Sequence, residues 1–425
     1  MFIMVNETAR ININNILERA IDIGQRMLVT GAEVSRVERT INFICRAYGV
    51  RHVDVMVITT SIVVTLRGEE IGVLTQMRRV PGQNFDFQRL KALNQLSREI
   101  CAHPMTSDEI KKRIREIDTM EVISLKASLF YWALIAASFS AFFGGRFDDA
   151  VCAGIVGVLL RLLQHLLAQT KLNPYFGLVL LSFVGGMLAN SFMYFGLDIH
   201  PAAINMGNIM PVIPGLALMN SIRDMFNQET ISGLIKSAEA FILSLLIATG
   251  FAFSATGTLI AFETTGWVYL LTSFVGGFCF HLLWHGHFKD AVMGAVVCMG
   301  AWGFTMLFVA MGWNEFAGYF AGAVFATIAA EILARIYKSP ATIFLIIGVI
   351  AMVPGGSLYR TMFYAIAADW EKFGTQGIKT FLYAVSIAAG IVIATAIWET
   401  VKAWLMKRKK KDGISCTEEC CEGKS

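Results

Sequence analysis

The chain changes from a mixed polar and apolar pattern to long apolar runs near residue 123. Charged side chains recur at short intervals in residues 1–122 and are sparse in residues 123–406. A helix that crosses a bilayer needs roughly 20 mainly apolar residues. Ten runs suit this length: Leu125–Phe143, Ala150–Ala168, Pro174–Phe195, Pro201–Ser221, Gly233–Thr256, Trp267–Trp284, Ala291–Met311, Phe316–Ile336, Pro340–Tyr359 and Ile378–Trp404. The pattern predicts a soluble segment followed by ten transmembrane helices, in a mainly α membrane protein.

The fourth and ninth runs each contain a Pro-Gly pair. Residues 213–218 read IPGLAL and residues 353–358 read VPGGSL. Proline has no backbone N–H and glycine adds backbone freedom, so such a pair releases amide and carbonyl groups from a helix. Lipid cannot satisfy these groups, and matched breaks in two halves of a membrane protein are typical of a transporter's substrate site. Both runs therefore indicate discontinuous or re-entrant helices as an alternative to clean spans.

Sequence matches beyond the Pro-Gly pairs indicate an internal repeat. The matches are 145–151 with 286–292, Asn173 with Asn314, Gly177 with Gly318 and Pro201 with Pro340. They predict a first five-helix unit at residues 123–257 and a second at 258–406. Because five is odd, the second copy must enter the membrane from the opposite side. We therefore expect two inverted repeats.

Residues 1–122 predict a small soluble α+β domain. Apolar spacing predicts helices at Asn6–Val29, Glu33–Tyr48, Phe85–Cys101 and Ser107–Asp118, and β-rich runs predict strands at Val53–Ile58, Ile62–Leu66 and Ile71–Met77. The domain has no Cys-His arrangement, CxxC pair or phosphate-binding glycine loop. We therefore expect no enzyme, no cofactor and no metal site.

Basic residues in the short loops predict the orientation. With the soluble domain in the cytoplasm, most basic loop residues and the run Lys407–Lys411 fall inside. The loop after the ninth run is discordant, because Arg360, Lys372 and Lys379 then fall outside. No secretory signal precedes the first run. We expect a multi-pass protein of the cell (inner) membrane with both termini cytoplasmic.

Residues 407–425 predict a short basic cytoplasmic tail. It contains Cys416, Cys420 and Cys421, for which metal binding, acylation and no role are alternatives. The chain has a formal net charge of +4, and its basic tail adjoins a membrane helix. Because topology explains this charge, we expect no nucleic-acid partner.

Several stretches resemble the threonine/serine exporter family. Residues 210–224 (MPVIPGLALMNSIRD) carry the main motif, 31–38, 46–49 and 94–98 resemble the N-terminal domain, and 354–359 (PGGSLY) resembles the C-terminal domain. The resemblance covers residues 10–405. It implies a ten-helix inner-membrane exporter of small hydroxy amino acids, driven by the proton gradient. Some relatives, split into two polypeptides, are associated with dicarboxylate export, so a dicarboxylate (succinate-type) exporter is the main alternative.

Either substrate class offers a carboxylate, and a helix that resumes after a break offers free N–H groups and a positive dipole end. The substrate-binding candidates are Pro214, Gly215, Leu218, Asn220, Pro354, Gly355, Gly356, Ser357, Tyr359 and Arg360. Asn220, Ser357 and Tyr359 can add neutral hydrogen bonds. Arg360 and Arg223 can receive a second carboxylate, with a snorkelling or loop role as the structural alternative.

Proton coupling needs a shielded ionisable group. Glu331 is the first candidate because it lies deep in the eighth run and aligns with Asn190 in the other repeat. An intrahelical i,i+4 pair with Arg335 is its structural alternative. Asp224 and Glu239 are the second candidates.

The expected partners are a small-molecule substrate, protons and membrane lipid. The sequence leaves open whether the chain forms a homo-oligomer. A membrane-anchored sensor or enzyme is a further alternative. The repeat argues against it, because an anchor needs one helix and gains nothing from a duplicated, broken one.

Overall fold

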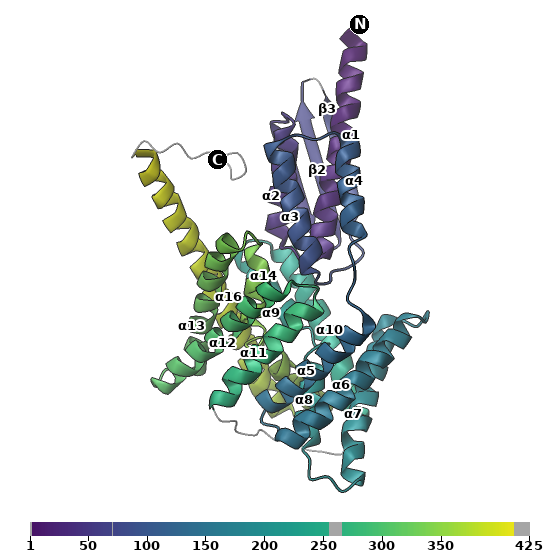
Figure 1. Ribbon diagram of the computed structural model, residues 1–425, viewed down its shortest axis with the longest axis vertical. Helices are drawn as coiled ribbons and strands as arrows, with labels where there is room; N and C mark the ends of the chain where they lie inside the picture. Colours follow the sequence, from purple (N-terminus) through teal and green to yellow (C-terminus); the bar gives the residue numbers. More distant parts are fainter. Residues whose placement is uncertain (1, 70, 255–265, 412–425) are drawn as a thin grey trace. The chain divides into compact units, whose positions relative to one another are not determined.

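The computed structural model describes residues 2–69, 71–254 and 266–411 and is mainly helical (Figure 1). Contacts divide it into two compact units, one made mainly of residues up to Val122 and the other of Ile123–Trp398. The predicted repeat boundary at residues 257 and 258 lies outside the described residues, as do Cys416, Cys420 and Cys421.

The N-terminal unit, which we predict to be soluble and call the soluble unit, packs four helices with one small sheet. Its elements are α1 (Phe2–Val29), α2 (Val34–Ala47), β1 (His52–Ile58), β2 (Ser61–Gly68), β3 (Gly72–Arg79), α3 (Phe87–Ala102) and α4 (Ser107–Asp118). The strands pair antiparallel in the order β1-β2-β3, and alternate β2 residues Ile62, Val64 and Leu66 are buried. This alternation is that of a sheet with one covered face. The predicted order of helices and strands is confirmed.

A half-buried carboxyl joins α2 to the sheet. Glu38 accepts a hydrogen bond from the backbone N–H of Val57 at 2.9 Å. Burial raises the pKa of the Glu38 carboxyl, and this hydrogen bond partly opposes the rise. Glu38 therefore fastens α2 to β1.

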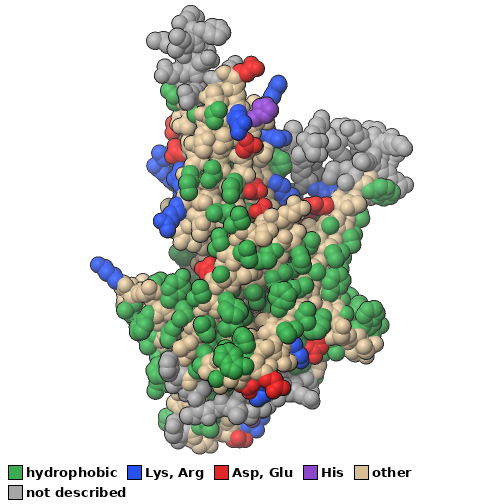
Figure 2. All heavy atoms as spheres, turned by 180° about the vertical axis from the view of Figure 1, so that it is seen from behind, with side chains coloured by type: hydrophobic (Ala, Val, Ile, Leu, Met, Phe, Trp, Pro, Cys, Tyr) green, Lys and Arg blue, Asp and Glu red, His purple; other side chains and the backbone are tan. Residues whose placement is uncertain are grey.

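The second unit consists of long apolar helices interrupted by two pairs of short ones. They are α5 (Leu125–Phe142), α6 (Phe147–Ala168), α7 (Pro174–Tyr194), α8 (Pro201–Ile209), α9 (Gly215–Phe226), α10 (Thr230–Ser254), α11 (Gly266–Leu283), α12 (Phe288–Ala310), α13 (Glu315–Ile336), α14 (Ala341–Val349), α15 (Gly355–Ile366) and α16 (Trp370–Lys411), of which the part up to Trp398 belongs to this unit. Figure 2 shows apolar side chains spread over the surface of this unit, and large ones such as Phe147, Trp267 and Ile336 are exposed. Such a surface suits lipid.

Within the described ranges, eight helices are long and apolar enough to cross a membrane, so the predicted count of ten spans is not confirmed. The eight are α5, α6, α7, α10, α11, α12, α13 and α16. The fourth and ninth predicted runs are instead split into α8 with α9 and α14 with α15. The physical reason is the Pro-Gly pair at each break, which interrupts the helical hydrogen bonds.

The order of helix lengths repeats along the chain for the first five helices of each half, and the sixth helix differs. Helices α5–α10 have 18, 22, 21, 9, 12 and 25 residues, and helices α11–α16 have 18, 23, 22, 9, 12 and 42. This repetition agrees with a duplicated unit. Opposite insertion of the two halves stays a prediction.

A buried aspartate holds the start of the second helix in the first half. Asp149 accepts hydrogen bonds from the backbone N–H groups of Arg146 (2.8 Å) and His200 (2.6 Å), and its carboxylate lies 2.9 Å from Nδ1 of His200. The aligned Asp290 contacts Ser339, whose Oγ lies 3.4 Å from Oδ2 of Asp290. Both aspartates therefore link a helix start to the segment that precedes a broken helix.

We expect Asp149→Ala to destabilise the membrane unit by about 2–6 kcal/mol. The substitution leaves two backbone donors without an acceptor, and each unsatisfied buried group costs roughly 1–3 kcal/mol. Thermal unfolding in detergent micelles measures the loss. The neighbouring Asp148 is exposed, so Asp148→Ala is the matched control and should unfold at the wild-type temperature. Equal unfolding temperatures for both variants would show that the buried contacts of Asp149 contribute nothing.

Candidate functional site

The two Pro-Gly breaks have the same backbone conformation. Pro214 precedes α9 with φ −80° and ψ 40°, and Pro354 precedes α15 with φ −76° and ψ 42°. Each proline carbonyl then accepts the first hydrogen bond of the resumed helix, from the N–H of Leu218 (3.1 Å) or Leu358 (2.8 Å). The two breaks are therefore equivalent in structure as well as in sequence.

The breaks pack directly against each other. A Cβ added to Gly215 would lie 2.5 Å from Cγ1 of Val353 and 3.1 Å from Cα of Gly355. A Cβ added to Gly355 would lie 2.8 Å from Cγ2 of Ile213. Because real Cβ atoms do not approach this closely, both positions need glycine for the backbones to meet.

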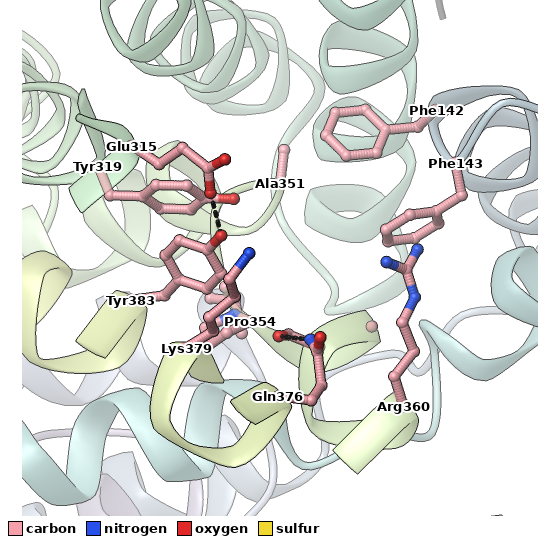
Figure 3. A pocket seen from close by; sticks show the side chains of 13 residues that line it. Phe142, Phe143, Glu315, Tyr319, Ala351, Pro354, Arg360, Gln376, Lys379 and Tyr383 are labelled. Carbon is pink, nitrogen blue, oxygen red and sulfur yellow. Dashed lines mark hydrogen bonds between the residues drawn. The ribbon is translucent and has the colours of Figure 1, made fainter. Parts of the chain in front are cut away.

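A cavity of about 300 Å³ lies beside the second break (Figure 3). This volume is at the lower end of the range for small-molecule sites. Its walls come from the end of α5, the start of α13, the second break, α15 and the first turns of α16. The lining residues are Phe142, Phe143, Glu315, Tyr319, Ala351, Val353, Pro354, Gly356, Ser357, Arg360, Gln376, Lys379 and Tyr383.

Free backbone donors and a hydroxyl meet where α15 begins. The described part of the chain contains no hydrogen-bond acceptor for the N–H groups of Gly356 and Ser357, as is usual in a first helical turn. The Oγ of Ser357 accepts a hydrogen bond from Nε2 of Gln376 at 2.6 Å and lies 2.9 Å from Oγ1 of Thr380. These contacts hold the Ser357 hydroxyl at the cavity wall, beside N–H groups suited to an anion.

Charged side chains occupy two sides of the cavity. In Figure 3, Glu315, Tyr383 and Lys379 lie at one side and Arg360 extends at the other, toward Phe143. The hydroxyl of Tyr383 donates a hydrogen bond to Glu315. Neither Arg360 nor Lys379 forms an ion pair with any residue that the structure describes. Both cations are thus available to a bound anion.

The cavity contains part of the predicted substrate-binding set. Pro354, Gly356, Ser357 and Arg360 line it, whereas Pro214, Gly215, Leu218, Asn220, Gly355 and Tyr359 do not. Tyr359 is buried in an apolar cluster, with its ring 5.7 Å from that of Phe251. The Oδ1 atom of Asn220 is buried and has no hydrogen-bond partner in the described structure. The first break therefore supports the second by packing and does not border this cavity.

The predicted proton-coupling candidates lie outside the cavity lining. Glu331 forms an ion pair with Arg335 at 2.8 Å, which is the intrahelical pair that the sequence offered as the alternative to a proton-coupling role. Arg335 also stacks over the ring of Trp398. Asp224 forms a buried ion pair with Lys236 at 2.7 Å. Glu239 is exposed on α10. Proton coupling through these residues stays a prediction.

Sequence reasoning missed Glu315, Lys379 and Tyr383 as residues of the site. One signal was available, because Lys379 is a charged residue at the second position of the tenth apolar run. Glu315 directly follows Asn314, whose side chain accepts a hydrogen bond from the N–H of Ala317, and it belongs to no sequence motif that indicates a binding role. The described chain holds no cluster of three His, Cys, Asp or Glu residues that could bind a metal ion.

Comparison with known proteins gives consistent matches to exporters. A family profile described as "Putative threonine/serine exporter" matches residues 18–257, and one described as "Threonine/Serine exporter, ThrE" matches residues 269–397. The chain is 25% identical over 439 residues to the "Threonine/serine exporter" of Corynebacterium glutamicum, covering 96% of this chain and 86% of that protein. The two profiles together cover most of the soluble unit and nearly all of the membrane unit.

Two further relatives differ in the substrates that their names give. The chain is 21% identical over 401 residues to a "Probable threonine/serine exporter" of Mycobacterium tuberculosis, covering 89% of this chain and 75% of that protein. It is 23% identical over 249 residues to the "Probable succinate transporter subunit YjjP" of Escherichia coli, covering 58% of this chain and 95% of that protein. No solved structure matches the chain.

Proposed function

Because the chain belongs to the threonine/serine exporter family, we propose that it exports threonine and serine by secondary active transport. The observation that carries the proposal is the cavity beside the Pro354-Gly355 break, which offers free N–H groups, a hydroxyl and opposite charges in one small volume. A zwitterion with a hydroxyl side chain complements each of these groups.

In the proposed complex, the substrate carboxylate lies at the start of α15. It accepts hydrogen bonds from the N–H groups of Gly356 and Ser357 and pairs with Arg360, which lies one helical turn further on. The substrate hydroxyl bonds to the Ser357 and Gln376 side chains. The ammonium group faces Glu315 at the other side of the cavity. Every polar group of threonine or serine then has a partner.

We propose that this cavity faces the outer side of the membrane. In the predicted orientation, the end of α5 and the starts of α13 and α16 all lie on that side. These are the segments that supply Phe142, Phe143, Glu315, Gln376 and Lys379 to the cavity wall. An outward-facing cavity is the state from which an exporter releases its substrate.

The proton gradient is the proposed energy source. Glu331, Asp224 and Glu239 remain the proposed coupling residues, and the ion pairs of the first two would have to open for them to exchange protons. If the proton gradient drives export, substrate flux must change when a pH gradient is imposed.

A dicarboxylate exporter is the second candidate function. The presence of two cations in the cavity, Arg360 and Lys379, favours it, because two carboxylates could pair with them. The match to the succinate transporter subunit supports the same alternative.

The test is transport by the purified full-length protein in lipid vesicles. Vesicles loaded with labelled threonine, serine or succinate are compared with and without an imposed pH gradient. We expect gradient-dependent efflux of threonine and serine. Efflux of succinate alone would assign the chain to dicarboxylate export, and no efflux of any of the three would contradict both candidate functions.

A further inference from the structure

The cavity has an uneven charge distribution that bears on which substrate it accepts. Glu315 is its anionic side chain, and Arg360 and Lys379 are its cationic ones. Glu315 and Lys379 lie at the same side, with Arg360 opposite (Figure 3). A substrate that spans the cavity therefore has one end beside Arg360. Its other end lies beside both Lys379 and Glu315.

The Glu315 carboxylate is held by aromatic residues. The hydroxyl of Tyr383 donates a hydrogen bond to it, and the Tyr383 ring stacks on the Tyr319 ring with a centroid separation of 4.5 Å. Tyr319 in turn meets Trp302 edge to face at 5.9 Å. This packing restricts the position of the Tyr383 hydroxyl, so the carboxylate that it contacts is held at the cavity wall and is less free to swing away.

We propose that Glu315 selects amino-acid zwitterions over dicarboxylates, an inference that rests on the proposed function. With one carboxylate at Arg360, the second end of a zwitterion is an ammonium group that Glu315 attracts. The second end of a dicarboxylate is a carboxylate that Lys379 attracts and Glu315 repels. Proteins commonly gain specificity from a charged side chain that repels a like-charged group of a competing ligand. Glu315 thus offsets the second cation of the cavity.

The test compares threonine and succinate efflux from vesicles that contain the full-length protein. We expect Glu315→Gln to raise the ratio of succinate to threonine efflux at least about tenfold, because repulsion of the second carboxylate is lost. A glutamine oxygen can still accept the Tyr383 hydrogen bond, so the wall keeps its shape. Lys379→Gln should lower the same ratio, because it removes the second cation.

Glu371→Gln is the matched control. Glu371 is an exposed acid in the first turn of α16 and does not line the cavity, so the same change of charge there should leave the ratio at its wild-type value. If Glu315→Gln fails to enter the membrane, Lys379→Gln tests the same charge balance by itself.

Each outcome separates this inference from the proposed function. A wild-type protein that exports threonine, together with an unchanged ratio in Glu315→Gln or Lys379→Gln, overturns the role of Glu315 and leaves the function intact. A wild-type protein that exports succinate in preference to threonine overturns it as well, because Glu315 should then exclude that substrate. A wild-type protein that exports neither contradicts the proposed function itself.

Discussion

Gly355→Ala is expected to abolish threonine efflux while the protein still inserts into the membrane. The added methyl group would lie 2.8 Å from Cγ2 of Ile213, and Gly215→Ala would place one 2.5 Å from Cγ1 of Val353. Isoleucine and valine are stiff at χ1, so neither neighbour can turn aside freely. Overpacking of this kind costs about 1–3 kcal/mol and is relieved by moving the backbone, here the two breaks themselves. Efflux from vesicles with matched protein content measures the effect.

Gly177→Ala is the matched control for both glycine variants. Gly177 lies in α7, and a Cβ added there would meet no atom within 4 Å. Alanine also has the higher helix propensity, so this variant should insert and transport like the wild type. Normal efflux by Gly355→Ala and Gly215→Ala would mean that the contact between the breaks does not matter for transport.

Arg360→Gln is expected to raise the threonine concentration for half-maximal efflux about ten- to a hundredfold. In the proposed complex Arg360 pairs with the substrate carboxylate, and a hydrogen bond to a charged group contributes roughly 1.5–3 kcal/mol. A difference of about 1.4 kcal/mol corresponds to a tenfold change in affinity. The concentration dependence of efflux from loaded vesicles measures this shift.

Lys372→Gln supplies the comparison for Arg360→Gln. Lys372 lies in the first turn of α16, pairs with Asp369 at 2.8 Å and does not line the cavity. Removing its charge should leave the half-maximal concentration unchanged. If both variants behave alike, the effect reflects the charge of the surrounding surface and not a contact with the substrate.

The sequence predicted the broken helices because their cause is local. A proline inside an apolar run removes a helical hydrogen bond and clashes with the preceding turn, so Pro214-Gly215 and Pro354-Gly355 indicated breaks without any knowledge of the packing. Strand alternation and helix periodicity likewise predicted the order of elements in the soluble unit, with small shifts at their ends.

The composition of the cavity was only half predictable, because it depends on contacts between distant segments. Ser357 and Arg360 follow the Pro354-Gly355 motif directly and were found through it. Glu315 and Tyr383 are 68 residues apart and carry no shared motif, so only the packing of α13 against α16 brings them together. Tyr359 adjoins the motif and yet packs in an apolar cluster, because the residues around it also come from distant segments.

The most direct test of the account asks whether substrate occupies the cavity beside the second break. In the Ser357→Cys variant, the rate of thiol alkylation at position 357 is followed by peptide mass spectrometry, with the native Cys101 of the soluble unit as internal reference. We expect threonine to slow alkylation at position 357 severalfold and to leave the rate at Cys101 unchanged. Equal rates with and without saturating threonine, in a variant that still transports it, would contradict the assignment of this cavity as the substrate site.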